Sequence, residues 1–217
     1  MGKIQEIARA FHGKLSVFKK HPPIVDSVGF GDFLATRASY ISQKKLYEYL
    51  KTRMGMQYPK MFEDEVFVRS INVAKWGVYA ACLSDLAIYM AANLHLENQD
   101  KSVPSEMARY WHHFVIDERF DNDEFDGDRA KLKKEFETRL KDIDWADAAE
   151  FEGAFQKSPK ALIRLAPIAD ELKKYDSFYV QNSIRFAWQS IRREYVKLLD
   201  RDAVLADWEI YRTDMKV

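Results

Sequence analysis

Cysteine is nearly absent from this sequence of 217 residues, in which Cys82 is the single example. One cysteine excludes an internal disulfide and a zinc site built from several thiolates. Because Cys82 stands inside an apolar stretch, we expect a buried and unreactive thiol. The N-terminus also lacks the apolar core and small-residue cleavage site of a secretory signal peptide. The sequence therefore predicts a protein of the reducing cytoplasm.

Signatures of common catalytic and phosphate-binding sites are lacking too. The chain has no Gly-x-Ser-x-Gly elbow, no Walker lysine loop and no Gly-x-Gly-x-x-Gly fingerprint. It also has no His-Glu-x-x-His and no Glu-x-x-His pair of the kind that holds di-iron centres in helical bundles. These absences leave enzymatic activity undecided, and no cofactor is predicted.

An excess of charge of one sign is missing as well, since 34 basic residues balance 34 acidic ones. A net charge of zero gives no general attraction to nucleic acid, so such a partner is not expected. The charges are uneven along the chain: residues 1–60 hold 11 basic and 4 acidic residues, whereas residues 97–150 hold 9 and 16. Either these segments pair in the fold, or one end of the molecule presents a basic face.

Apolar residues at three- and four-residue spacing, by contrast, run along most of the chain. This period indicates amphipathic helices, and no useful strand-like alternation competes with it. We predict an all-α, bundle-like globule of about seven to nine helices around a central apolar helix at 62–96. Prolines and glycines predict a linker at 21–32, between a basic amphipathic helix at 1–20 and an all-α globular domain at 33–217.

Capping residues and prolines set the expected helix boundaries. Asp32 is expected to cap the helix that follows the linker. Ser158 starts a later helix, which Pro167 should kink or split. Asp176 or Ser177 is then expected to open the last long helix.

The longest apolar run covers residues 76–94 and carries one formal charge, Asp85. A seam of mostly small residues at helical spacing passes through it: Ser70, Ala74, Gly77, Ala81, Ser84, Ile88 and Ala91. Such a seam allows close helix packing in a core or in a membrane. A mid-bilayer aspartate costs about 2.5–3.5 kcal/mol, so we expect a core helix.

Asp85 falls on an otherwise apolar helix face, where a carboxylate needs a partner or a proton. One interpretation is a structural ion pair with Arg185 or Arg192 of the last long helix, or a hydrogen bond from a tyrosine. The other is a desolvated acid or base in a pocket between the helices at 62–96 and 177–200.

This second interpretation makes the protein a helical enzyme or a small-molecule-binding protein. The candidate pocket residues are Asp85, Tyr79, Tyr89, Arg185, Trp188 and Arg192, to which His112 and His113 are additional candidates. In that case the carboxylate would face an open cavity rather than a guanidinium or a hydroxyl.

The N-terminal segment suggests a different and preferred function. Its residues combine an apolar and a basic face, and the candidate contact residues are Lys3, Arg9, Phe11, Lys14, Phe18, Lys19 and Lys20. Basic amphipathic helices bind anionic membrane surfaces or grooves on protein partners. We therefore expect a non-enzymatic interaction protein, peripheral to the inner face of a membrane or bound to another protein, with the basic residues of 37–53 extending the contact face.

Two weaker patterns concern metals. His113 and Asp117 lie four residues apart, which places both on one face of a helix and provides half of a metal site. The acidic segment 121–128 has Lys133 where an EF-hand needs a bidentate glutamate, so a solvated acidic loop is expected there. The sequence therefore predicts no metal site, and His113 and Asp117 are only weak candidates.

Overall fold

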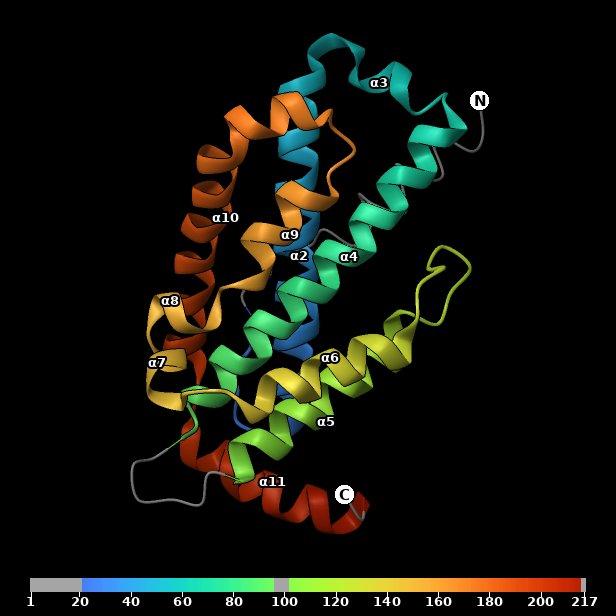
Figure 1. Ribbon diagram of the computed structural model, residues 1–217. Coiled ribbons are helices and arrows are strands. Elements are labelled where there is room, and N and C mark those ends of the chain that lie inside the picture. The colour runs from blue at the N-terminus through green and yellow to red at the C-terminus, as the bar shows by residue number, and fades with distance from the viewer. Residues whose placement is uncertain (1–20, 96–101, 216–217) are drawn as a thin grey trace.

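The computed structural model of the protein describes residues 21–95 and 102–215 (Figure 1). These residues form helices and no strand, which confirms the all-α prediction. The elements are α2 (Ser27–Met54), the 3-10 turn η1 (Gly55–Gln57), α3 (Tyr58–Met61), α4 (Glu65–Ala92), α5 (Ser102–Arg119), α6 (Arg129–Lys141), α7 (Trp145–Ala149), α8 (Phe151–Ala154), α9 (Lys157–Leu165), α10 (Asp170–Leu198) and α11 (Arg201–Met215). In the same residues, no helix is long and apolar enough to cross a membrane.

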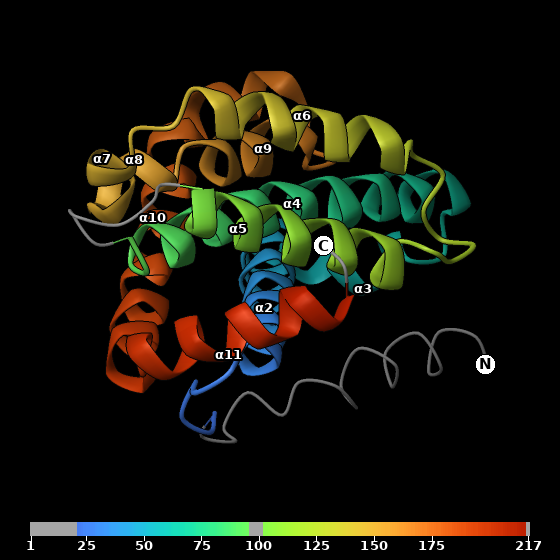
Figure 2. The same cartoon turned by 90° about the horizontal axis from the view of Figure 1, so that it is seen from below.

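The predicted central helix is α4, and the structure confirms its place. Asp64 caps it by accepting a hydrogen bond from the backbone N–H of Val66 at 2.8 Å. Nearly all of its second half is buried, because helices cover it on several sides: α2, α5 and α9 all pack against it. Seen from below, α6 and α9 lie on one side of the α4–α5 layer, and α2 and α11 lie on the other (Figure 2).

The small-residue seam of α4 is where α9 approaches. A Cβ atom built on Gly77 would come within 2.5 Å of the Leu165 Cδ1 atom on α9. A larger residue at position 77 would therefore push the two helices apart or force Leu165 to move.

The start of α2 corrects the predicted linker. The helix begins at Ser27, so residues 27–32 of the expected linker at 21–32 are helical. Asp26, and not Asp32, is the N-cap, and its carboxylate accepts the Gly29 N–H at 2.6 Å. Gly31 belongs inside the helix because its missing side chain leaves room for the Trp111 ring of α5, which a Cβ atom would approach to 2.2 Å.

Helix α10 also begins earlier than expected, at Asp170 rather than at residues 176–177. Pro167 does break the preceding helix, since α9 ends at Leu165. The longer α10 packs lengthwise against α2 and α9 (Figure 1). At its far end, the Ile24 N–H donates to the Leu198 carbonyl at 2.8 Å, which joins the chain before α2 to the end of α10.

Candidate functional site

Asp85 lies at the junction of three helices and is completely buried. Arg139 of α6 donates to the Asp85 Oδ1 atom at 2.7 Å, and to the Ser84 hydroxyl at 2.9 Å. The other Asp85 oxygen accepts the backbone N–H of Ser158 at 2.7 Å, while Oδ1 also accepts the N–H of Lys157 at 3.1 Å. The carboxylate therefore caps α9 from another helix, a task that the Gln156 side chain at the N-cap position leaves undone.

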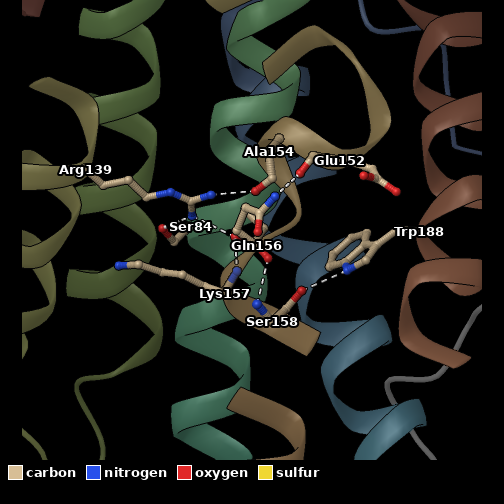
Figure 3. Close-up of polar contacts among 9 residues, drawn as sticks. Ser84, Arg139, Glu152, Ala154, Gln156, Lys157, Ser158 and Trp188 are labelled. Atoms are coloured by element: carbon tan, nitrogen blue, oxygen red, sulfur yellow. Dashed lines mark hydrogen bonds and ion pairs between the residues drawn. The ribbon is translucent and has the colours of Figure 1, made fainter. Parts of the chain in front are cut away.

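The junction continues from α9 to α10. The Arg139 guanidinium also donates to the Ala154 carbonyl at 2.5 Å, and Trp188 Nε1 donates to the Ser158 hydroxyl at 3.0 Å (Figure 3). Polar groups from α4, α6, α9 and α10 thus satisfy one another in the interior. We call Ser84, Asp85, Arg139, Ser158 and Trp188 the Asp85 junction. Its chemistry is that of a structural ion pair and helix cap, because each of the two carboxylate oxygens already accepts hydrogen bonds.

The expected ion pair thus exists, but its cation comes from α6 and not from Arg185 or Arg192. Arg185 donates to the Asn182 side chain at 3.3 Å. Arg192 lies over the Tyr89 ring, with 5.0 Å between its guanidinium carbon and the ring centroid. A helical wheel gives the face on which Asp85 lies, but it does not give which helix covers that face.

The six candidate pocket residues do not converge on one cavity. Tyr79 is buried elsewhere, donates to the Ala35 carbonyl at 3.3 Å and stacks on Phe120. Asp85 and Trp188 meet only through Ser158, within the Asp85 junction.

Tyr89 and Arg192 do line a hollow between α4 and α10, where the sequence places a pocket. It has a volume of about 540 Å³. The other residues around it are Gln189, Arg193, Val196 and Lys197. We call this the basic hollow, because Arg192, Arg193 and Lys197 supply its charge and none of its lining residues is acidic. Arg193 and Lys197 make no ion pair within residues 21–95 and 102–215.

The solvent side of α10 is unusually apolar. Tyr175 and Tyr179 are each 74% exposed, Phe178 is 71% exposed and Phe186 is 70% exposed. Three of these rings, all but Phe178, belong to a stripe of residues spaced alternately by three and four: Leu172, Tyr175, Tyr179, Asn182, Phe186, Gln189, Arg193 and Val196. We call these residues the α10 stripe. Its last three members also line the basic hollow, so the two features form one continuous surface.

Most of the basic residues of 37–53, expected to extend a contact face, form ion pairs with acidic residues of the protein itself. Arg37 binds Glu194 of α10 at 2.5 Å. Lys45 contacts Glu48 at 2.8 Å, and Arg53 forms an ion pair with Asp176. The candidate contact residues Lys3, Arg9, Phe11, Lys14, Phe18, Lys19 and Lys20 lie outside the described residues.

His113 and Asp117 face α6, where each meets a partner of its own. The His113 Nε2 atom is 3.5 Å from a Glu137 oxygen, and Lys133 binds Asp117 at 2.5 Å. Burial lowers the pKa of His113. No group of three or more metal-ligating side chains gathers anywhere in the described ranges. This face of α5 therefore provides two separate polar pairs rather than a metal site.

A second cavity lies on the other side of α4, between α6 and α9. Its volume is about 580 Å³, within the range of pockets that hold small molecules. Its apolar floor comes from α4, with Val73, Trp76, Gly77, Ala80 and Ala81. We call it the α6–α9 groove, because residues of α6 and α9 form its two walls: Lys131, Leu132, Glu135 and Phe136 on one side, and Lys157, Lys160, Ala161, Arg164 and Leu165 on the other.

No known protein family matches the chain, and neither curated proteins nor solved structures provide a similar one.

Proposed function

We propose that this protein is a non-enzymatic interaction domain that binds an amphipathic helix of a protein partner along the α10 stripe. The observation that carries the proposal is the solvent exposure of four aromatic rings on one helix face, at 70–74% each. Contiguous apolar surface of this kind is uncommon on soluble monomers and marks sites of association. Aromatic side chains are also the residues that most often dominate binding energy in protein interfaces.

The spacing of the stripe supports a helical occupant. Alternate steps of three and four residues produce a straight seam on a helix, which is the geometry by which two helices pack side by side. The stripe spans residues 172–196, so it is about 36 Å long at 1.5 Å per residue. A partner helix lying along it would contact the aromatic rings in its first half and the basic hollow in its second half.

The basic hollow supports an acidic partner. Its rim holds Arg192, Arg193 and Lys197 and no carboxylate, and Tyr89 lies at its base. An aspartate or glutamate of the partner would form charge-assisted hydrogen bonds there. The partner helix thus carries an apolar seam with acidic residues toward the end that meets Val196.

Site-specific photo-crosslinking tests the proposal. A photoreactive amino acid is placed at Tyr179, and in a matched variant at Lys134, an exposed position on α6. Crosslinked chains from the native cell extract are identified by mass spectrometry and their crosslinked peptides are mapped. We expect capture from position 179 and not from position 134, with the crosslinks confined to one acidic amphipathic helix of the partner.

Affinity for the purified partner peptide then provides the decisive measurement. Tyr179→Ser should weaken binding by about 2 kcal/mol, which is about 30-fold in Kd, because it removes a large ring from the centre of the interface. Arg193→Glu should weaken it through charge repulsion, whereas Ile210→Ser, which removes an exposed apolar residue of α11, should have no effect. Equal effects of Tyr179→Ser and Ile210→Ser, or crosslinks from α10 to a second copy of this chain, would overturn the proposal.

A further inference from the structure

The α6–α9 groove, which takes no part in the proposed helix binding, is lined by four cations, of which Lys157 is the least exposed. Lys157, Lys160 and Arg164 follow one another at three- and four-residue spacing on the α9 wall, and Lys131 faces them from α6. None of these four side chains forms an ion pair in the part of the chain that the structure describes. By comparison, Arg139 of α6 forms an ion pair with Asp85.

The acidic residues of the lining offset these cations only in part, chiefly through Glu135, whose charge acts on Lys157. Asp126 and Asp128 belong to the loop at one end of the groove, and the Asp128 carboxylate already caps α6 by accepting the Lys131 N–H at 3.0 Å. Glu135 is the only acid on the walls themselves. The α9 wall carries three cations and no carboxylate.

Two buried polar atoms in the lining also lack partners. His112 is 2% exposed, and its Nδ1 atom has no hydrogen-bond partner among the described residues. The Trp76 Nε1 atom is buried without a partner as well. The His112 ring stacks on Phe136 at 3.8 Å between centroids, which fixes its orientation. A ligand or a water molecule is the usual partner of such buried atoms.

We infer that the α6–α9 groove binds a linear amphiphilic anion, with its apolar chain on the α4 floor and its carboxylate or phosphate head at Lys157. The floor from Val73 to Ser84 is about 16 Å long at 1.5 Å per residue, which suits an extended chain better than a compact ring system. The head group lies at the Ser84 end, where Lys157, Gln156 and His112 line the cavity together.

The electrostatics of that end favour an anion. Lys157 is half-buried, and burial together with the nearby Arg139 lowers its pKa. Glu135 and Asp85 act in the opposite direction but do not outweigh these two effects. A negatively charged head group would offset them further, because it adds counter-charge next to Lys157. Lys160 is one helical turn away on the same wall, close enough for a second contact.

Calorimetric titration of the full-length protein tests this inference. The probes are dodecanoate and dodecyl phosphate below their micelle concentrations, with dodecyltrimethylammonium and acetate as controls for charge and chain. We expect saturable 1:1 binding of the two anionic amphiphiles and none of the controls. Tighter binding of one anionic probe would identify the head group. Equal binding of the cationic amphiphile, or no binding of either anionic one, would overturn the inference.

Variants locate the site. Lys157→Gln should weaken dodecanoate binding about tenfold or more, since it removes a charge-assisted hydrogen bond, while the exposed Lys134→Gln should leave it unchanged. Ala81→Phe, which fills the floor, should abolish binding, and thermal unfolding shows whether that variant is folded. Should it fail to fold, the smaller change Ala81→Leu replaces it and should weaken binding by narrowing the floor. Binding that is insensitive to both Lys157→Gln and the second variant would place the amphiphile elsewhere and overturn the inference.

Discussion

The Asp85 junction and the α10 stripe both contain aromatic and polar side chains, but those of the junction are buried and those of the stripe face solvent. In the junction, a carboxylate, a guanidinium, a hydroxyl and an indole are buried and bind one another. On the stripe, the rings of Tyr175, Tyr179 and Phe186 remain in solvent, each at least 70% exposed. Both include residues of α10, one on its inner and one on its outer side. The contrast separates residues that hold the fold together from residues that are left over for another molecule.

Asp85→Ala should disrupt the Asp85 junction and cause the largest loss of stability. It leaves the largely buried Arg139 without a counter-ion and uncaps α9, so we expect a loss of about 3–5 kcal/mol in the free energy of unfolding. Urea denaturation followed by circular dichroism measures this. Asp85→Asn, which keeps an acceptor oxygen, should lose less. A loss below about 1 kcal/mol for Asp85→Ala would show that the junction is dispensable.

Ser158→Ala should give the next largest effect. The change removes the acceptor of the buried Trp188 Nε1–H and leaves that donor unsatisfied, at a cost of about 1–3 kcal/mol. Trp188→Phe removes the donor instead, and the double variant should lose less than the sum of the two single ones. Strict additivity in this double-mutant cycle would mean that the two side chains do not interact.

Acid should lower the stability of the fold through the buried residue His112. Burial holds the pKa of His112 well below its ordinary value of 6.5, with further lowering from His113 and Lys157. Below pH 6.5 His112 binds a proton in the unfolded chain but not in the folded one. Its contribution to stability is therefore fully present above that pH and is lost as the pH falls. The slope is at most about 1.4 kcal/mol per pH unit for each histidine. Denaturation midpoints at pH 7.5, 6.5 and 5.5 should show this decline.

His112→Phe keeps a ring against Phe136 and removes the titrating group. The decline between pH 6.5 and 5.5 should become shallower in this variant, and the remainder should come from His113, whose pKa is also lowered. An unchanged slope would mean that His112 is not the group responsible.

Tyr179→Ser should have the smallest effect on stability. Its ring is 74% exposed and belongs to no buried network, so the free energy of unfolding should change by less than about 0.5 kcal/mol. The same variant is expected to weaken partner binding, so its effect should be large on affinity and negligible on folding stability. A stability loss comparable to that of Ser158→Ala would assign the ring a structural role instead.

Local signals in the sequence predicted the helices well and their neighbours poorly. Helical periodicity identified α4 as the central helix. The position of Asp85 on an apolar helix face indicated that its carboxylate needs a partner. That this partner is Arg139 depends on which helix covers that face, a matter of tertiary packing. Similarly, the glycines before residue 32 predict a break in the helix, because nothing in the sequence indicates that Trp111 packs against Gly31.

The α10 stripe was missed for a local reason. Its three- and four-residue spacing is readable in the sequence, but starting the helix at residue 176 or 177 left Leu172 and Tyr175 outside it. The Ala169–Asp170 boundary carries no side-chain cap in the structure, so no capping signal marked it. The α6–α9 groove gave a fainter signal, namely the helical spacing of Lys157, Lys160 and Arg164. Periodicity cannot show that these cations are unpaired, because that depends on which acids the fold brings near.

The capping of α9 by Asp85 also bears on the order of folding. The two hydrogen bonds join Asp85 to Lys157 and Ser158, which follow it by 72 and 73 positions in the chain. Helix α9 has only nine residues, too few for a stable helix on its own. Its first turn is therefore completed only once α4 is in place, so α9 should appear late and cooperatively, together with the docking of α6. One carboxylate thereby makes the folding of the second half of the chain conditional on that of the first.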